Sequence, residues 1–151
     1  MKAQNSDQRL NRLTDDLKEK HHCHTIILYG SRARGDYNDA SDYDVIAIRE
    51  VGPAVRDCRM FEGAFLDAFI YSVADLNKSG ESLLRIKDGI VLCQNDDIGE
   101  KLLENVKETI RKGPNPIPDW ERQVIVTWHE KMFERASKGD IEGNFRRIWQ
   151  L

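Results

Sequence analysis

The sequence LYGSRARGD at residues 28–36, followed by SDYDVI at residues 41–46, decides the fold. The run Thr25–Tyr29 is short, apolar and rich in strand-forming residues, and it ends directly at Gly30. We therefore expect a buried strand that stops in a turn. A second strand is expected over Tyr43–Ile48. The two strands are expected to be neighbours, because the turn at Gly30 must face the carboxylates that begin the second strand.

The turn after the first strand has the composition of an anion-binding site. A glycine at position 30 lets backbone N–H groups approach an anion closely, and Ser31 adds a hydroxyl donor. Arg32 and Arg34 place positive charge in the same segment of a chain whose net charge is −3. These residues favour a cradle for a triphosphate. The glycine spacing matches a P-loop, but Asp36 stands where that motif requires lysine, and no GxGxxG fingerprint occurs.

Three carboxylates form the candidate metal site. Asp42 and Asp44 are two residues apart, so their side chains are expected on one face of the strand. Neighbouring carboxylates repel each other, and a cation that prefers oxygen ligands, Mg²⁺ or Mn²⁺, relieves this repulsion. Asp67 lies within the apolar run Phe65–Ile70, where an unpaired charge is costly, and a metal or catalytic site explains its presence. The alternatives are a simple turn at Gly30-Ser31, turn or strand-edge roles for Asp42 and Asp44, and an ion pair with a buried arginine for Asp67.

Residues 26–71 resemble the nucleotidyltransferase superfamily that includes DNA polymerase beta, in the motifs Gly30-Ser31, Gly35, Ser41-Asp42-x-Asp44-Val45 and Asp67. The resemblance is closest to the minimal and the antibiotic-modifying nucleotidyltransferases. It implies that Gly30 and Ser31 hold the nucleotide phosphates and that Asp42 and Asp44 hold two metal ions. It also implies that Asp67 joins these ligands and deprotonates the acceptor hydroxyl. Arg34 is suggested as a further phosphate contact.

The resemblance implies an enzyme of the EC 2.7.7 type that uses two Mg²⁺ or Mn²⁺ ions. It would transfer a nucleoside monophosphate, AMP when the NTP is ATP, to a hydroxyl group and release pyrophosphate. The acceptor would be a small molecule of the aminoglycoside type or a protein side chain, because minimal nucleotidyltransferases often adenylylate a toxin partner. The alternative is an antitoxin-like binding module that neutralises a partner protein with little or no turnover. The carboxylate triad discriminates between the two, since a pure binder has no need of it.

The remaining pattern predicts an α/β (α+β) fold: a small mixed sheet with helices on one side, followed by a C-terminal helical tail. Helices are expected over residues 8–20, within 73–88 and over 97–112, a short one at 31–34, and further strands over 64–71 and 90–93. Prolines at positions 114, 116 and 118 form a stiff linker. The linker divides the chain into a catalytic domain, residues 1–113, and a helical extension, residues 114–151.

The extension is rich in large apolar side chains. One helix is expected over residues 119–138, where Trp120 and Trp128 form a core or interface rather than a base-stacking platform. A last helix, capped by Asp140, carries an apolar face up to the final residue, formed by Ile141, Phe145, Ile148, Trp149 and Leu151. This open face indicates a contact with a second subunit, or a truncated form of a longer protein.

Composition limits the class of protein. The chain has 151 residues, of which 32% are charged, and its net charge of −3 speaks against a long nucleic acid as acceptor. Apolar runs are too short to span a bilayer, and the N-terminus lacks the apolar core of a signal peptide. Three cysteines without a CxxC pair predict no disulfide framework and a cytoplasmic location. The cluster His21–His24 lacks the ligand spacing of a zinc site and is expected to be a polar link between a helix and a strand.

Overall fold

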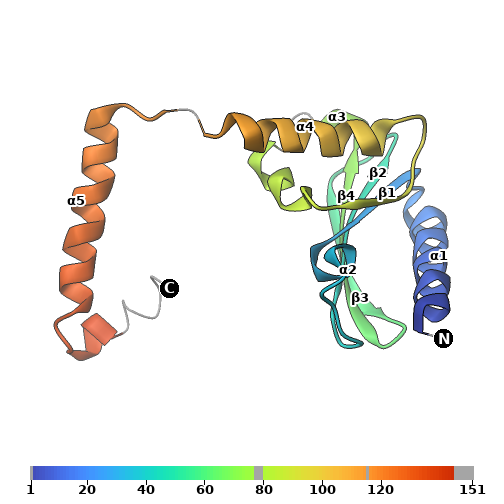
Figure 1. Cartoon of the computed structure of the whole chain (residues 1–151), viewed down its shortest axis with the longest axis horizontal. Coiled ribbons are helices and arrows are strands. Elements are labelled where there is room, and N and C mark those ends of the chain that lie inside the picture. The colour runs from blue at the N-terminus through green and yellow to red at the C-terminus, as the bar shows by residue number, and fades with distance from the viewer. Residues whose placement is uncertain (1, 77–79, 115, 145–151) are drawn as a thin grey trace. The chain divides into compact units, whose positions relative to one another are not determined.

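The computed structural model describes residues 2–76, 80–114 and 116–144 (Figure 1). The chain forms two compact units, Met1–Gly113 and Pro114–Leu151. The first unit is built on a β-sheet and the second on a long helix. Within the described residues, none of the helices has the length and apolar character that crossing a membrane requires.

Five strands form one mixed sheet in the order β3-β4-β2-β1-β5, namely β1 Thr25–Tyr29, β2 Tyr43–Arg49, β3 Val55–Phe61, β4 Ala64–Ser72 and β5 Ile90–Cys93. β1 pairs antiparallel with both β2 and β5, β2 pairs parallel with β4, and β3 pairs antiparallel with β4. The expected adjacency of the first two strands is confirmed, with Tyr29 opposite Asp44. The parallel register also sets Asp44 directly beside Asp67.

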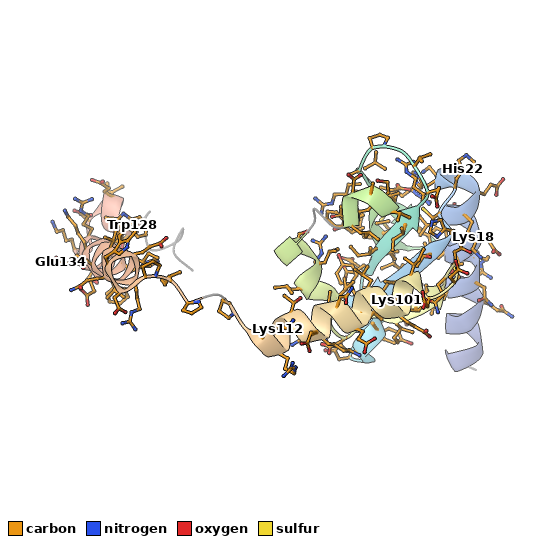
Figure 2. The ribbon with its side chains drawn as sticks, turned by 90° about the horizontal axis from the view of Figure 1, so that it is seen from above. Lys18, His22, Lys101, Lys112, Trp128 and Glu134 are labelled. Atoms are coloured by element: carbon orange, nitrogen blue, oxygen red, sulfur yellow. The ribbon has the colours of Figure 1, made fainter. Side chains whose placement is uncertain are left out.

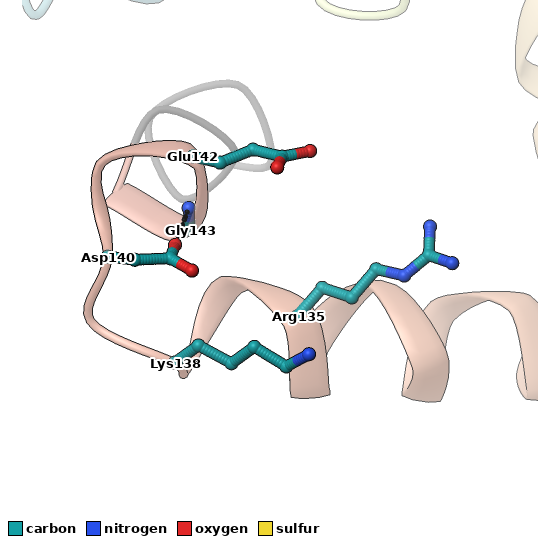
Figure 3. A pocket seen from close by; sticks show the side chains of 5 residues that line it. All are labelled: Arg135, Lys138, Asp140, Glu142 and Gly143. Carbon is teal, nitrogen blue, oxygen red and sulfur yellow. Dashed lines mark hydrogen bonds between the residues drawn. The ribbon is translucent and has the colours of Figure 1, made fainter.

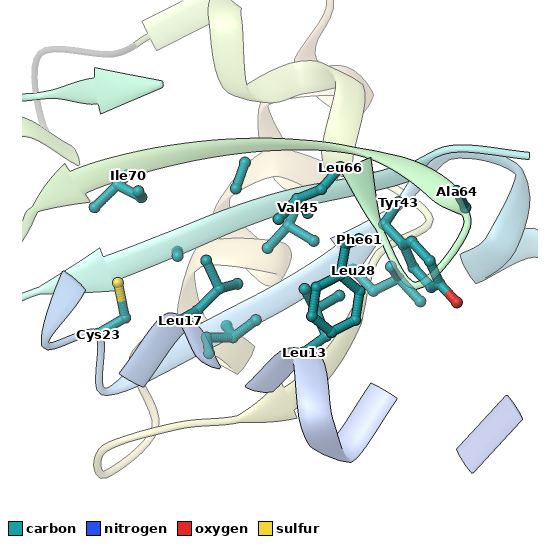
Figure 4. Close-up of a cluster of buried hydrophobic side chains, with 13 residues drawn as sticks. Leu13, Leu17, Cys23, Leu28, Tyr43, Val45, Phe61, Ala64, Leu66 and Ile70 are labelled. Carbon is teal, nitrogen blue, oxygen red and sulfur yellow. The ribbon is translucent and has the colours of Figure 1, made fainter. Parts of the chain in front are cut away.

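Helices cover both faces of the sheet, so the expectation of helices on one side only is wrong. On one face, α1 (Lys2–His21) packs Leu13 and Leu17 into a core with residues of β1, β2 and β4 (Figure 4). On the other face lie α4 (Ile98–Lys112) and the 3-10 helix η1 (Gly80–Ile86), in a second core with Ile27 and Ile46. The physical reason is visible in β1, whose five residues are all buried. A strand without polar alternation needs cover on both sides.

β3 is a strand that the apolar pattern does not predict. It lies at the edge of the sheet and carries polar side chains on both faces, with Arg56 and Cys58 on one side and Asp57 and Arg59 on the other. Only Phe61, at its end, is buried. Charged residues on an edge strand discourage pairing with further strands. Here they also make ion pairs within the chain, which the sequence alone does not reveal.

The histidine cluster is the expected polar link between α1 and β1. His21 contacts Asp57 on β3 with a nitrogen–oxygen distance of 2.8 Å, and His24 contacts the hydroxyl of Thr25 at 2.9 Å. Two short helices complete the first unit, α2 (Gly30–Arg34) after β1 and α3 (Val73–Leu76) after β4.

The second unit consists of α5 (Asp119–Ala136) and a short turn of helix over residues 141–144. The cap predicted at Asp140 is confirmed, because the amide of Gly143 donates to its Oδ1 at 2.6 Å. Most large apolar residues of α5 are exposed, among them Trp128, which Figure 2 shows on this helix. Ile141 is also exposed, and the other residues of the predicted apolar face, Phe145, Ile148, Trp149 and Leu151, lie outside the described residues.

Candidate active site

The candidate site lies where β1 ends and β2 begins. Gly30 directly follows β1 and has a φ of +75°, a conformation that favours glycine. A Cβ atom at this position would lie 2.3 Å from Oδ2 of Asp44, which is far closer than van der Waals contact. The backbone at Gly30 therefore approaches the Asp44 carboxylate more closely than any other residue type would allow.

Asp44 is a half-buried carboxylate among like charges. It makes no hydrogen bond or ion pair with another residue of the described ranges 2–76, 80–114 and 116–144. Burial raises its pKa above the usual value, and the negative charges of Asp42 and Asp67 raise it further. Arg85 and Arg34 act in the opposite direction. The charges of Asp42 and Asp67 thus both reach Asp44, and this repulsion favours a cation.

Asp67 differs from the other two carboxylates, because it is bound by an arginine. Arg56 donates from Nε to Oδ1 at 2.8 Å and from Nη2 to Oδ2 at 2.7 Å, and the Cys58 thiol approaches Oδ1 at 3.3 Å. The hydrogen bonds from Arg56 hold the pKa of Asp67 below its usual value. An arginine pair, the alternative considered from the sequence, is therefore present. The arginine is exposed on the edge strand rather than buried.

The donor set fits a divalent cation only in part. Asp42 and Asp44 offer oxygen atoms without hydrogen-bond donors from the described residues, which suits Mg²⁺ or Mn²⁺. Asp67 lies beside Asp44, but both of its oxygens are already bound to Arg56. Accordingly, no group of three histidine, cysteine or acidic side chains in the described part of the chain is arranged to hold a metal ion.

The loop between β1 and β2 is held by Arg32. Its guanidinium donates to the carbonyl of Ser41 at 2.6 and 2.9 Å and to that of Asp42 at 3.1 Å, and it stacks on the ring of Tyr43 at 3.9 Å. Arg32, which the sequence marks only as local positive charge, therefore positions the Asp42 backbone. Arg34 instead pairs with Asp36 at 3.2 Å on the surface.

The Ser31 hydroxyl makes no hydrogen bond with another described residue. Its backbone carbonyl accepts from the amide of Gly35 at 2.9 Å, which closes α2. The hydroxyl is thus available to donate to a ligand near Gly30.

Arg85, from η1, is a basic residue of this face that the sequence did not single out. Its guanidinium lies over the ring of Phe69 at 4.0 Å and over that of Tyr29 at 5.6 Å. Burial raises the pKa of the Tyr29 hydroxyl to about 12. Tyr29 therefore stays protonated and adds no charge to the carboxylate group. Arg85 lowers the pKa of both Asp44 and Asp67, so it sits within electrostatic reach of the site.

Two of the hollows in the described part of the chain lie in the second unit. One, of about 320 Å³, is lined by Arg135, Lys138, Asp140, Glu142 and Gly143 (Figure 3). Asp140 is engaged there as a helix cap, which gives this hollow a structural explanation. The other, of about 480 Å³, is an open groove along α5 lined by Trp120, Gln123, Val124, Thr127, Trp128 and Lys131.

Comparison with known proteins finds similarity in the part of the chain that contains the candidate site. The model of the nucleotidyltransferase domain family matches residues 10–112. A solved structure, the nucleotidyltransferase-like protein from Exiguobacterium sibiricum 255-15, is similar with a TM-score of 0.51 at 10% sequence identity. The likeness covers 68% of this chain and 38% of that chain, so this chain spans less than half the length of that protein. No match was found among curated protein sequences.

Proposed function

The chain belongs to the nucleotidyltransferase domain family, and on this premise we propose that it transfers a nucleoside monophosphate from an NTP to a hydroxyl group. We propose ATP as the NTP, so that AMP is transferred and pyrophosphate released, which is chemistry of the EC 2.7.7 type. The acceptor is a small molecule or a protein side chain. A carboxylate cluster supports an enzyme over an antitoxin-like binding module, because binding alone gives no reason to gather like charges.

The observation that carries the proposal is the environment of Asp44. A half-buried carboxylate with a structural role usually accepts hydrogen bonds. Asp44 instead faces the backbone of Gly30 and shares its surroundings with the charges of Asp42 and Asp67. Such an arrangement is destabilising until a cation or a cation-bound triphosphate arrives.

In the proposed reaction, the acceptor oxygen forms a bond to the α-phosphorus of the NTP. The bond from this phosphorus to the oxygen that bridges to the β-phosphorus breaks, and its electron pair leaves with pyrophosphate. Two bound Mg²⁺ or Mn²⁺ ions would supply positive charge at the attacking and leaving oxygens. The contribution of the chain is position and fixed charge.

The proposed roles follow from the positions of the residues. Asp42 and Asp44 are the main metal ligands. Gly30 gives the triphosphate access to the backbone, and the Ser31 hydroxyl donates to a phosphate oxygen. Arg34 leaves its ion pair with Asp36 and pairs with the same phosphates instead, to which it brings positive charge.

Asp67 is the proposed third ligand and the group that takes the proton of the acceptor hydroxyl. Both tasks require a carboxylate oxygen, and Arg56 engages both oxygens in this structure. Arg56 therefore competes with both tasks, and Asp67 performs them best when Arg56 releases at least one of its oxygens.

The test uses ATP labelled at either the α- or the γ-phosphate, Mg²⁺, and cell extract as the source of acceptor. Label is expected to enter a product from α-labelled ATP and not from γ-labelled ATP. The substitution Asp44→Asn is expected to abolish this incorporation of label. The matched control is Asp36→Asn, which removes the same charge from the exposed loop and should retain transfer. Product labelled from γ-labelled ATP would show phosphoryl transfer instead, and unchanged labelling by Asp44→Asn would contradict the proposed site.

We further propose that α5 contacts a second copy of the chain. Trp120 and Phe133 are 70% and 72% exposed, and a surface with several large exposed apolar side chains is typical of an interaction site. Light scattering at micromolar concentration is expected to show a dimer, and a monomer would contradict this proposal. A cytoplasmic location is also proposed, supported by three free cysteines at positions 23, 58 and 93.

A further inference from the structure

The contact between Arg56 and Asp67 joins an edge strand to the candidate active site. Arg56 lies on β3 and Asp67 on β4. In the antiparallel register Asp67 is opposite Cys58, which lies two residues after Arg56 on β3. The guanidinium meets the carboxylate in a two-point contact of 2.8 and 2.7 Å. Such bidentate pairs are among the stronger side-chain interactions, and they fix the orientation of both groups.

This contact occupies lone-pair positions of the carboxylate for which a metal ion would compete. A carboxylate offers about four lone-pair positions on its two oxygens. Arg56 takes one position on each oxygen, and the Cys58 thiol points at a further position on Oδ1. A metal ion at Asp67 is thus left with one unoccupied position, on Oδ2, unless it displaces Arg56 or Cys58.

The contact also changes the charge of the site. Asp42, Asp44 and Asp67 carry three negative charges when ionised, and the charge of Asp67 is balanced by Arg56. Asp67 is 17% exposed as a side chain and Arg56 is 56% exposed, so Arg56 is the partner with room to move into solvent. The guanidinium also lies over the ring of Phe69 at 4.7 Å, which keeps it near the site.

We propose that Arg56 competes with the divalent cation for Asp67 and thereby sets the metal affinity of the site. The inference rests on the proposed function and assigns to a residue of the edge strand a role in that same site. Arg56 is a positioning residue that acts through Asp67 and does not touch the substrate. In the absence of a cation, the positive charge of Arg56 neutralises Asp67. A cation that binds Asp67 has to compete with Arg56 for this carboxylate.

The experiment measures binding of Mn²⁺ alone, without nucleotide, by the loss of the free Mn²⁺ signal in electron paramagnetic resonance. Arg56→Gln is expected to bind Mn²⁺ about tenfold more tightly than the unchanged chain, because a nearby positive charge and a competing donor are both removed. Arg56→Lys keeps the charge but loses the two-point contact, and an intermediate affinity is expected. Arg111→Gln is the matched control, since it removes one exposed positive charge on α4 and should leave Mn²⁺ affinity unchanged.

A second substitution separates competition for Asp67 from a general effect of charge. In an Asp67→Asn background, Arg56→Gln is expected to change the Mn²⁺ affinity by less than threefold, because the contested carboxylate is gone. Equal effects in the two backgrounds, or unchanged or weaker Mn²⁺ binding by Arg56→Gln alone, would overturn the inference and leave the proposed function standing. Mn²⁺ binding that does not depend on Asp44 in any variant would overturn both.

Discussion

Two acidic residues on opposite faces of the sheet, Asp57 and Asp44, have opposite electrostatic surroundings. Asp57 faces α1 and is 9% exposed as a side chain. It contacts His21 at 2.8 Å and accepts from Lys20 at 3.3 Å and from Arg59 at 3.1 Å. Burial acts to raise the pKa of Asp57, but these hydrogen bonds outweigh it and lower the pKa. Asp44 has no such donors among the described residues, and its pKa is raised.

The difference separates a structural cluster from a candidate site. Around Asp57 the charges are balanced, and Arg59 also pairs with Asp16, so the network ties α1 to the edge strand. Around Asp44 the charges of Asp42 and Asp67 are repulsive, and no described residue donates a hydrogen bond to its carboxylate. Selection for stability alone would favour removal of these like charges, whereas binding of a cation requires the carboxylates that carry them. If this interpretation is correct, substitutions at the two positions must have different consequences.

The largest expected effect is the loss of transfer when Asp44 becomes asparagine. Asp44→Asn, and likewise Asp42→Asn, is expected to lower the rate by at least about 10³-fold, because the charge that holds the metal is lost. The folded state without metal should be as stable as before or more stable, since like-charge repulsion is removed. Turnover and thermal unfolding in a chelator check the two parts. Unfolding of these variants, with no effect of metal on the unchanged chain, would make the two carboxylates structural.

A second expected effect tests the close approach of Gly30 to Asp44. Gly30→Ala places a Cβ atom 2.3 Å from the carboxylate oxygen and must displace it. Displacement of a reacting group by about 1 Å costs on the order of 10²-fold in rate, and we expect a loss of this size in turnover. Gly63→Ala is the matched control, because Gly63 has a similar φ of +86° but no atom within 4 Å of the added Cβ. Equal loss of turnover in both variants would show that backbone strain alone is responsible.

The third effect concerns stability and lies on the other face. Asp57→Asn keeps the volume of the side chain but weakens its contacts with His21, Lys20 and Arg59, and we expect a loss of about 1–3 kcal/mol in the free energy of unfolding. Nucleotidyl transfer per folded molecule should not change. Chemical denaturation checks the stability, and Glu108→Gln on α4, whose partners are exposed, should show no measurable change. A fall in turnover without a fall in stability would mean that the Asp57 network belongs to the site.

The sequence predicts one half of the site better than the other, for a physical reason. Gly30, Asp42 and Asp44 belong to a local strand–turn–strand motif, and the antiparallel pairing of β1 with β2 brings them together. Asp67 is also found from the sequence, because a charge in an apolar strand is conspicuous. Its partner Arg56 is not, since β3 lacks apolar alternation and only the strand pairing places Arg56 near Asp67.

The sequence likewise does not predict that helices pack on both faces of the sheet, and the reason lies in packing. The apolar run of β1 shows burial but not what buries it, and α1 and α4 approach from opposite faces. The exposed apolar residues of α5 illustrate the same limit. Their spacing predicts a helix correctly, whereas their partner is not encoded in that spacing.

The smallest expected effect is a difference in pH dependence between the two faces, measured without metal. Unfolded aspartate titrates near pH 4. Because the pKa of Asp57 is lowered in the folded state, its stabilisation is complete above that value and is lost as the pH falls through the folded pKa. The stability advantage of the unchanged chain over Asp57→Asn should therefore shrink only below about pH 4.

The effect of Asp44 on stability has the opposite sign, because its folded pKa is raised and its ionised form destabilises the fold. Any advantage of Asp44→Asn over the unchanged chain should be complete above the folded pKa of Asp44 and shrink as the pH falls through that pKa toward about 4. Denaturation curves in chelator, measured from about pH 7 to well below pH 4, check both windows, and a common pH dependence of the two variants would remove the electrostatic contrast between the two faces.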